Sequence, residues 1–459
     1  MSVEFTSGVT AISEFVVRTA ISDTARERAA AAFIDTIGVM LAGASEPAAR
    51  IAQTLAADEG AGECRVLGTS IATSPGWAAF ANGVAAHALD YDDMCFVSLA
   101  HPSCALVPAL LAAGEISNAS ARTLLDAYVV GFEIECRLGA VMNPRHYHQR
   151  GWHCTSSIGT LGAAAAAARV LGIDAEQTRH ALGIAASSAC GLKENMGSMV
   201  KPLHAGMAAR NGVTAARLAE RGFMASAHAI DGPQGYLAAM DSEQASLDGA
   251  VADLGLRWEI EDTGITVKLY PSCAATHPPL DALKELVRRE RFTHDQVAAI
   301  DIEVDSMTPR LLIHPNPTTG LEAKFSMPFC AAAAVVYPRI SIDTFTVDRI
   351  RSTEVQSLMP RVALRANREF DTAAPLSQAR VTVRLRDGRE LSERADGARG
   401  YPGRLNEQEL SDKFADCAAR SLGPTTARDA WTTLTNWLAG TEERDIRSWL
   451  GALVSHAHS

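Results

Sequence analysis

GWHCTSSIGTLGAAAAAARVLG, residues 151–172, carries the clearest indication of the architecture. Residues 156–171 read as a helix, and residues 163–168 within it are all alanine. Such small side chains let neighbouring helices approach closely, so we expect this helix to lie in a packed interior. The stretch therefore predicts a helical bundle around it.

The rest of the first 260 residues or so also reads as alanine-rich helix. Each predicted helix begins at a polar cap or a proline, which are typical start signals. Asp174 with Gln177 three residues later resembles a capping box for a helix through Ile184. The other predicted helices begin at Ser22 or Asp23 and end near Gly43, begin at Ser74-Pro75 and run towards His87, and cover residues 102–115.

The pattern changes after about residue 263. Residues 299–306 alternate apolar with acidic side chains, as a half-buried strand does. Residues 381–385 alternate likewise, and Asp387-Gly388 then supplies a hairpin turn. Predicted helices at 279–289 and 322–336 interrupt these strands, so this region reads as α+β.

From Asn406 the chain returns to helix, with Glu409 completing a second capping box, and stays helical through Leu453. We therefore expect a mainly α protein with an α+β part. The prediction is a large helical domain built from both chain ends (1–262 and 403–459) and a smaller α+β domain (263–402).

Composition limits the class of protein. The chain has 459 residues, 47% of them hydrophobic and 21% charged, enough for a large core without disulfides. The net charge of −11 argues against a nucleic-acid binder but leaves room for an anionic substrate. No apolar run is long enough for a membrane span, and residues 1–5 do not read as a signal peptide. Nine cysteines without a CxxC pair indicate reduced thiols, so we expect a cytoplasmic protein.

Several catalytic motifs are absent. The sequence has no GxGxxG, GxxxxGK[ST], GxSxG or HExxH. Dinucleotide redox, P-loop phosphoryl transfer, nucleophile-elbow hydrolysis and zincin chemistry therefore lose their main support. Four dense segments of acids, bases and cations remain.

The first segment is HALDYDD at 87–93, followed by His101-Pro102-Ser103. Asp90, Asp92 and Asp93 repel one another, which raises the proton affinity of any that is buried and suits it to general base catalysis. The alternative is an exposed acidic loop, with His101 capping the next helix.

The second segment holds His146, His148 and His153 ahead of a hydroxyl-rich helix start. The free N–H groups of such a start favour an anion. The alternative is a capped helix with a packed tryptophan and an incidental histidine. Zinc is the poorest fit, because the histidines lack a regular ligand spacing.

The third segment, 197–206, contains Lys201 before Pro202 and His204. A residue before proline favours an extended backbone, so we expect Lys201 just ahead of a helix start. There it could hold a carboxylate; the alternative is a solvated surface lysine. The fourth segment, VKLYPSCAATHP at 267–278, lies at the predicted domain junction, a favoured place for ligand sites.

Two residues of the fourth segment have alternative readings. Cys273 is either a nucleophile or, more commonly for a free cysteine, a buried apolar residue. His277 stands before two prolines and is expected to cap the helix that follows.

In order and spacing, the four segments resemble the MmgE/PrpD family, which includes 2-methylcitrate dehydratase, cis-aconitate decarboxylase and iminodisuccinate epimerase. The similar phrases are HALDYDD with AHPS, GWHCTSSIGTLGAAAAAARVLG, GSMVKPLHAGMAARNG and VKLYPSCAATHPPLDAL, with weaker ones at 322–336 and 412–418. The resemblance implies a helical domain from both chain ends with an α+β lid, a homodimer, and no metal or organic cofactor. It also implies removal of a proton next to a carboxylate of a small polycarboxylic acid.

The resemblance also assigns site residues. Lys201 and Lys268 would hold substrate carboxylates and stabilise the developing charge, His153 or Asp90 would be the base, and His101 the acid. His204, Tyr270, Ser272 and Cys273 would contact the substrate.

Three departures from the decarboxylase branch bear on the reaction. Met94 and Cys273 stand where that branch has threonine and histidine, and Phe329 stands where it has tyrosine. These changes count against decarboxylation of cis-aconitate. The resemblance then predicts a dehydratase acting on a small polycarboxylic acid such as 2-methylcitrate. An epimerase, a decarboxylase and a non-catalytic binding protein on the same fold stay open as alternatives.

Overall fold

The computed structural model describes residues 8–244, 246–373, 377–440 and 445–453, so residues 1–5, which bear on the signal-peptide expectation, lie outside it. The chain divides into two compact units. Unit 1 consists of Met1–Ala88, Asp92–Thr266 and Asn406–Ser459; unit 2 consists of Leu89–Tyr91 and Val267–Leu405.

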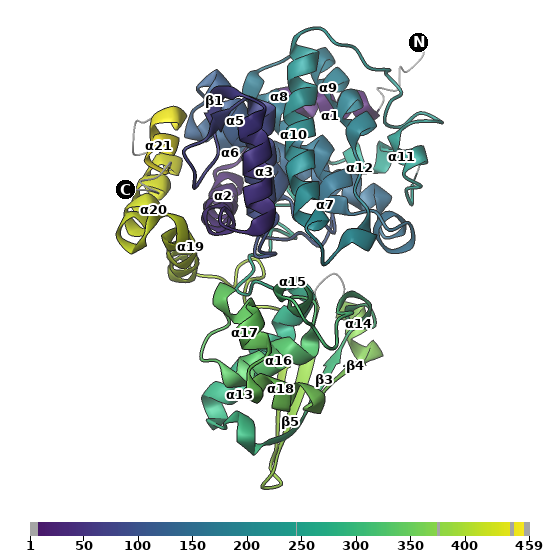
Figure 1. Ribbon diagram of the computed structural model, residues 1–459. Helices are drawn as coiled ribbons and strands as arrows, with labels where there is room; N and C mark the ends of the chain where they lie inside the picture. Colours follow the sequence, from purple (N-terminus) through teal and green to yellow (C-terminus); the bar gives the residue numbers. More distant parts are fainter. Residues whose placement is uncertain (1–7, 245, 374–376, 441–444, 454–459) are drawn as a thin grey trace. The chain divides into compact units, whose positions relative to one another are not determined.

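Unit 1 is almost entirely helical, and its only described strands form one small two-stranded ribbon (Figure 1). The ribbon pairs β1 (Ala61–Arg65) with β2 (Ala72–Thr73). The helices are α1 (Gly8–Arg18), α2 (Asp23–Gly43), α3 (Pro47–Asp58), α4 (Pro75–His87), α5 (Ser103–Ser117), α6 (Ala121–Met142), α7 (Cys154–Ser157), α8 (Gly159–Leu171), α9 (Ala175–Ser188), α10 (Val200–Glu220), α11 (Tyr236–Ala239), α12 (Asp248–Val251), α19 (Glu407–Leu422), α20 (Pro424–Leu438) and α21 (Ile446–Leu453).

Helix α8 lies in the core of unit 1, and all six of its consecutive alanines are fully buried. Small residues let its neighbours approach closely. A Cβ added to Gly212 of α10 would stand 2.5 Å from the Ala163 side chain, and one added to Gly131 of α6 would stand 2.9 Å from the Gly162 carbonyl oxygen. The expectation of a packed interior around 163–168 is confirmed.

Helices α4 and α10, which carry site residues, meet in the same way. A Cβ on Gly83 of α4 would lie 2.8 Å from Cα of Gly206 on α10. No side chain other than hydrogen fits at this crossing, so the two backbones lie in direct contact.

The C-terminal helices pack on the N-terminal ones. Lys413 of α19 forms a buried ion pair with Asp35 of α2, with 2.7 Å between Nζ and Oδ1. Ser421 Oγ donates to the Leu41 carbonyl of the same helix at 2.6 Å. The predicted capping box of Asn406 and Glu409 begins α19.

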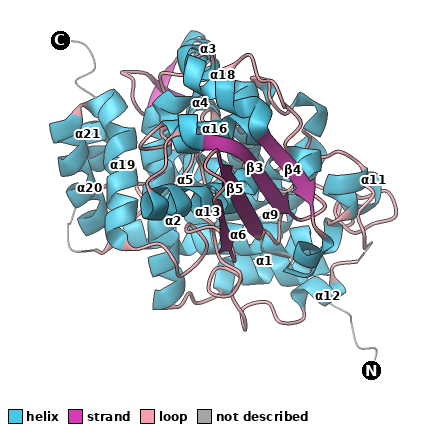
Figure 2. Cartoon of the chain, turned by 90° about the horizontal axis from the view of Figure 1, so that it is seen from below, coloured by secondary structure: helices cyan, strands magenta, loops and turns pink. Residues whose placement is uncertain are grey.

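Unit 2 contains a four-stranded sheet in the order β4-β3-β5-β6. Strand β3 pairs in parallel with β4 and antiparallel with β5, and β5 pairs antiparallel with β6 (Figure 2). The strands are β3 (Val297–Val304), β4 (Val362–Ala366), β5 (Ala379–Leu385) and β6 (Glu390–Ala395), and the longer helices are α13 (His277–Glu290) and α16 (Met327–Val336).

The strand predictions are confirmed. The apolar side chains of β3 and β5 that alternate in the sequence, such as Ile302 and Val381, are fully buried. Gly388 has φ +91° in the turn between β5 and β6, a conformation that favours glycine. Mainly helical structure with a smaller α+β part is therefore the observed fold class, as expected.

Two predicted helices are each broken into two. The single helix predicted over 322–336 is wrong. Two helices cover this stretch, α15 (Gly320–Ala323) and α16, which begins at Met327. Ser326 caps α16 by accepting from Phe329 N, and Pro328 occupies its first turn, where a missing N–H costs nothing. In place of one helix over 156–171, α7 and α8 meet at Ile158.

Within the described ranges, no single helix is both long and apolar enough to cross a membrane. Helices α2 and α3 reach that length and composition only when taken together, and they are bent by 89°.

Candidate active site

Unit 1 brings four histidines and a lysine together from helix ends. His87 is the last residue of α4, and His101 lies two residues before α5. His153 is the residue before α7, and Lys201 and His204 lie in the first turns of α10. Of these, His101 alone is half-buried; the others are buried. We call these five residues the histidine cluster.

Asp92 connects two of the histidines. His87 Nδ1 lies 2.7 Å from Asp92 Oδ2, and His101 Nδ1 lies 3.5 Å from the same oxygen. Because an ionised carboxylate only accepts hydrogen bonds, His87 carries its proton on Nδ1. His101 Nδ1 also lies 2.8 Å from the backbone carbonyl of Asp93, so it too is protonated there. In both rings Nε2 is therefore the atom that gains or loses a proton.

The rings of the cluster are in contact. His87 lies edge-on to His101 with 4.7 Å between ring centroids, and stacks on His153 at 5.8 Å and 23°. His153 in turn contacts His204, with 3.0 Å between the two Nδ1 atoms. That contact is a hydrogen bond only when one Nδ1 carries a proton and the other does not, so the two rings are in opposite tautomers.

Burial keeps two of these imidazoles neutral. It lowers the pKa of His153 well below 6.5, and the nearby Lys201 ammonium adds to the effect. Burial, reinforced by His87 and Lys201, lowers the pKa of His204 to about 4. Both rings are unprotonated at neutral pH, so each can accept a proton there.

The three aspartates of the DYDD phrase are buried, which contradicts the exposed acidic loop. Asp93 accepts from the backbone N–H of Ser103 at 3.2 Å and from its hydroxyl, and the Ser103 hydroxyl also meets Tyr128 Oη at 2.5 Å. Burial raises the pKa of Asp93 well above its usual value. His101 does not cap α5 either, because its ring bonds the Asp93 carbonyl and Pro102 precedes the helix.

Lys201 differs from both sequence expectations. It is not extended ahead of the helix but is the second residue of α10, with Pro202 third. Proline is tolerated there because the first-turn N–H groups need no helical partner. Lys201 is also only 5% exposed, so it is not a solvated surface lysine.

His87, Asp92 and His101 are residue types that also bind metal ions. Two ligands of a tetrahedral zinc ion stand about 3.3 Å apart. The 2.7 Å between His87 Nδ1 and Asp92 Oδ2 is shorter and matches a hydrogen bond. The arrangement is that of a carboxylate–imidazole pair.

Unit 2 holds the other two predicted catalytic residues. Lys268 donates to Asp90 Oδ1 at 2.7 Å and to the Asp90 carbonyl at 2.9 Å, and both residues are buried. Asp90 has φ +51°, a left-handed conformation that is unfavourable for a residue with a side chain. Lys324, also buried, donates to the Leu89 carbonyl. Two lysines therefore anchor residues 89–91 to unit 2.

The predicted substrate contacts of unit 2 bond with their own neighbours. The Tyr270 hydroxyl donates to Asp281 at 2.7 Å, and the Ser272 hydroxyl meets that of Thr276 at 2.8 Å. Cys273 is half-buried, and its backbone N–H donates to the Lys324 carbonyl.

His277 is the first residue of α13 rather than its cap. Its ring bonds the Ser272 carbonyl at 3.2 Å instead. Phe329 packs in the core of unit 2, edge-on to Phe345 at 5.5 Å.

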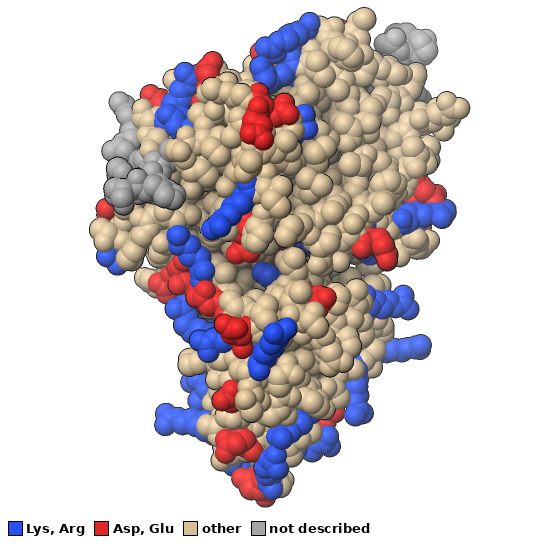
Figure 3. Space-filling view, viewed as in Figure 1, with Lys and Arg blue, Asp and Glu red and all other residues tan. Residues whose placement is uncertain are grey.

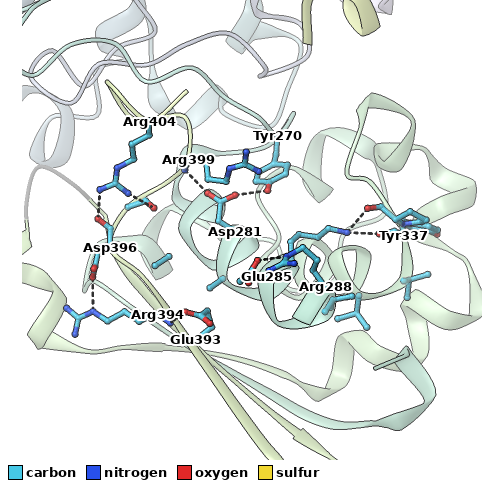
Figure 4. Close-up of a pocket in the computed structure, with 18 residues that line it drawn as sticks. Tyr270, Asp281, Glu285, Arg288, Tyr337, Glu393, Arg394, Asp396, Arg399 and Arg404 are labelled. Atoms are coloured by element: carbon cyan, nitrogen blue, oxygen red, sulfur yellow. Dashed lines mark hydrogen bonds and ion pairs between the residues drawn. The ribbon is translucent and has the colours of Figure 1, made fainter. Parts of the chain in front are cut away.

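Tyr270 also lines a hollow of about 1010 Å³ on unit 2 (Figure 4). Asp281 lies at its wall and accepts from both Tyr270 and the backbone N–H of Arg399. Most charged side chains around the hollow bond within the protein, for example Arg288 with Glu285. On the face of unit 2 that Figure 3 shows, acidic and basic side chains are intermixed.

Sequence reasoning missed His87, Ser103 and Lys324 as site residues. His87 and Ser103 stood inside quoted phrases, but nothing in their spacing distinguished them from ordinary helix ends. Lys324 lies in the weaker phrase EAKFS, and its burial, which the sequence does not show, is what distinguishes it from a surface lysine.

The comparisons with known proteins agree on one family. Residues 10–247 match the MmgE/PrpD N-terminal domain, and residues 270–438 match the MmgE/PrpD C-terminal domain. The cis-aconitate decarboxylase-like protein oryM of Aspergillus oryzae is 29% identical over 86% of each chain. The cis-aconitate decarboxylase of Mus musculus is 29% identical over 84% of this chain and 83% of its own. That of Homo sapiens is 30% identical over 76% of this chain and 73% of its own.

Proposed function

Since this chain belongs to the MmgE/PrpD family, we propose that it is a lyase that removes a proton next to a carboxylate of a small polycarboxylic acid. The observation that carries the proposal is the histidine cluster, where neutral imidazoles lie close to a buried lysine. Relatives named for cis-aconitate, a tricarboxylic acid, support the substrate class.

His153 is the proposed base. Its lowered pKa keeps it unprotonated at neutral pH, which a proton acceptor requires. Lys201, whose charge reaches His153 and His204, is the proposed partner of a substrate carboxylate and of the negative charge that develops when the proton leaves. A positioned base of this kind contributes about 10²–10⁴-fold to the rate.

His101 is the proposed acid. Its Nδ1 is held by the Asp93 carbonyl, so Nε2 is the atom that delivers a proton. Asp92 Oδ2 lies 3.5 Å from the same Nδ1. Asp90 and Lys268 form an ion pair in unit 2, and their part in the reaction stays a prediction.

We favour dehydration of a hydroxy tricarboxylate such as 2-methylcitrate. Elimination of water needs a base for the proton and an acid for the departing hydroxyl, and the cluster offers one imidazole for each. Met94, Cys273 and Phe329 depart from the decarboxylase branch, which counts against decarboxylation. Homodimer assembly and a cytoplasmic location accompany this proposal as predictions.

Decarboxylation of cis-aconitate is the second candidate. It is supported by the relatives of Aspergillus oryzae, mouse and human, whose similarity covers most of this chain. Epimerisation uses the same first step and differs only in returning the proton to the opposite face.

One experiment separates these reactions. The purified protein is incubated in heavy water with 2-methylcitrate, citrate, cis-aconitate and iminodisuccinate, and each mixture is followed by NMR. We expect 2-methylcitrate to lose water. Consumption of cis-aconitate with release of CO₂ would favour the second candidate, and deuterium uptake without a change in composition an epimerase. Binding without turnover of any acid would contradict the proposed activity and favour a non-catalytic binding protein.

A further inference from the structure

Thr155 links the proposed acid to the helix that begins beside the proposed base. Its hydroxyl oxygen accepts from the backbone N–H of His101 at 3.0 Å, and the residue is fully buried. Thr155 is the second residue of α7, and His153 is the residue directly before that helix. One side-chain hydrogen bond therefore connects the segment that carries His101 with the segment that carries His153.

The backbone of His153 is part of the same helix start. Its carbonyl accepts from the N–H of Ser156 at 2.9 Å and from that of Ser157 at 3.1 Å, and its own N–H donates to the Gly191 carbonyl at 2.9 Å. Thr155 lies in the turn that these bonds close. Its hydroxyl therefore has a defined place relative to His153.

The other bonds that hold His101 come from its own stretch of chain. The Asp93 carbonyl lies 2.8 Å from the ring Nδ1, and the Cys104 thiol donates to the His101 carbonyl at 3.2 Å. Both partners lie within residues 93–104, whereas Thr155 is 54 residues further along the sequence. The Thr155 bond therefore ties this local structure to the helix beside the base.

Elimination of water needs the base and the acid in place on one substrate. The base takes the proton from carbon, the C–O bond breaks, and the acid gives its proton to the departing hydroxyl, which leaves as water. A displacement of about 1 Å in an active site can lower the rate by about 10²-fold. A hydrogen bond that fixes the backbone of the acid against the helix of the base therefore bears directly on this reaction.

We propose that Thr155 is a positioning residue, whose hydroxyl oxygen holds the backbone of His101 in place relative to His153. This role rests on the proposed function, because it requires that the two histidines act on the same substrate. Thr155 acts through His101 rather than on the substrate itself.

The test replaces the hydroxyl and then restores it. Thr155→Val keeps the branched side chain and removes the acceptor of the His101 N–H, and Thr155→Ala removes the same oxygen with a smaller side chain if the valine variant does not fold. Thr155→Ser keeps the oxygen. Thr160→Val is the matched control, because Thr160 is equally buried but donates to the Ser156 carbonyl at 2.7 Å instead. Tm is measured for every variant to separate loss of fold from loss of rate.

The reaction is followed by NMR in heavy water with 2-methylcitrate. Thr155→Val should lose water about 10–10²-fold more slowly than the wild type at unchanged KM. Deuterium should enter the unreacted acid, because His153 still removes the proton and a deuteron returns before the hydroxyl leaves. Thr155→Ser and Thr160→Val should behave like the wild type.

Deuterium uptake distinguishes positioning of the acid from a general loss of stability, which would slow proton removal and water loss together. Such joint slowing in Thr155→Val would overturn the role. So would a wild-type rate in Thr155→Val, or a rate in Thr155→Ser as low as that of Thr155→Val.

Amide exchange of His101 tests the contact without any substrate. In protein labelled with ¹⁵N-histidine, this N–H should exchange with heavy water about tenfold or more faster in Thr155→Val than in the wild type, Thr155→Ser or Thr160→Val, because its partner is lost. If the wild type turns over no acid yet shows this pattern, the link between the two segments stands and the proposed function fails. Equal exchange in all of these proteins would overturn the positioning role, whatever the activity.

Discussion

At the scale of single residues, hydrogen bonds decide which nitrogen of His87 and of His101 holds a proton. Asp92 accepts a hydrogen bond from Nδ1 of His87, and the Asp93 carbonyl accepts one from Nδ1 of His101. Both rings therefore carry a proton on Nδ1. His153 and His204 share one bond and are neutral. The tautomers of His87 and His101 are therefore set before substrate arrives.

Asp92→Asn tests this control of tautomers. An amide at this position can donate to Nδ1 of His87 and so favours the opposite tautomer. We expect kcat to fall by about 10²-fold or more, with little change in KM. The ¹⁵N chemical shifts of His87 should report a proton moved to Nε2. Asp126→Asn is the control, because it breaks an ion pair with Arg26 away from the cluster. It should change neither kcat nor the ¹⁵N chemical shifts of His87. A wild-type tautomer and rate in Asp92→Asn would exclude the assigned role.

The pH dependence of the rate follows from the lowered pKa of the proposed base. A base loses activity when it is protonated, and burial places the pKa of His153 well below 6.5. The acid limb of kcat/KM should therefore lie well below pH 6.5. Measurement of kcat/KM as a function of pH checks this. An acid limb centred at or above pH 6.5 would show that His153 is not the essential base.

At the scale of elements, local signals predicted helix starts and strands but not breaks. The capping box of Asp174 and Gln177 begins α9 as expected, because both of its bonds are local. Lys201 was expected outside α10 because it precedes a proline, yet that proline lies in the tolerated first turn. The break between α15 and α16 depends on a cap at Ser326 that competes with a continuous helical pattern.

Asp174→Ala measures what the cap contributes. The side chain accepts from Gln177 N at 2.8 Å, so its loss should destabilise unit 1 by about 1 kcal/mol without changing kcat. Urea unfolding followed by circular dichroism gives the free energy. Glu176 lies in the same turn but outside the capping box, so Glu176→Ala should lower the free energy of unfolding by less. Equal losses in the two variants would show that the capping box contributes no specific stability.

At the scale of the whole molecule, contacts between residues distant in sequence could not be read from patterns. His153 and His204 are 51 residues apart, and Asp90 and Lys268 are 178 apart. No periodicity relates such positions, because they meet only after helices pack. The family resemblance, now confirmed, nominated these residues, whereas the partners of Lys268 and the role of Asp92 came from the structure.

The ion pair of Asp35 and Lys413 gives a stability test at this scale. It joins α2 to α19 and is buried on both sides. Lys413→Met leaves the Asp35 carboxylate without its cation and should destabilise the protein by about 3–5 kcal/mol. The double variant Asp35→Leu/Lys413→Met should recover much of that loss, because no charge stays buried. Thermal and urea unfolding of both variants check this; a double variant as unstable as the single one would contradict it.

The rate of proton removal in His153→Gln tests whether the histidine cluster of unit 1 takes the proton from the substrate. Loss of the C–H signal of the substrate is followed by NMR in heavy water for wild type and variant, with Tm as a check on folding. We predict a rate about 10²-fold or more below wild type at unchanged Tm. A folded variant that removes the proton at the wild-type rate would contradict the account.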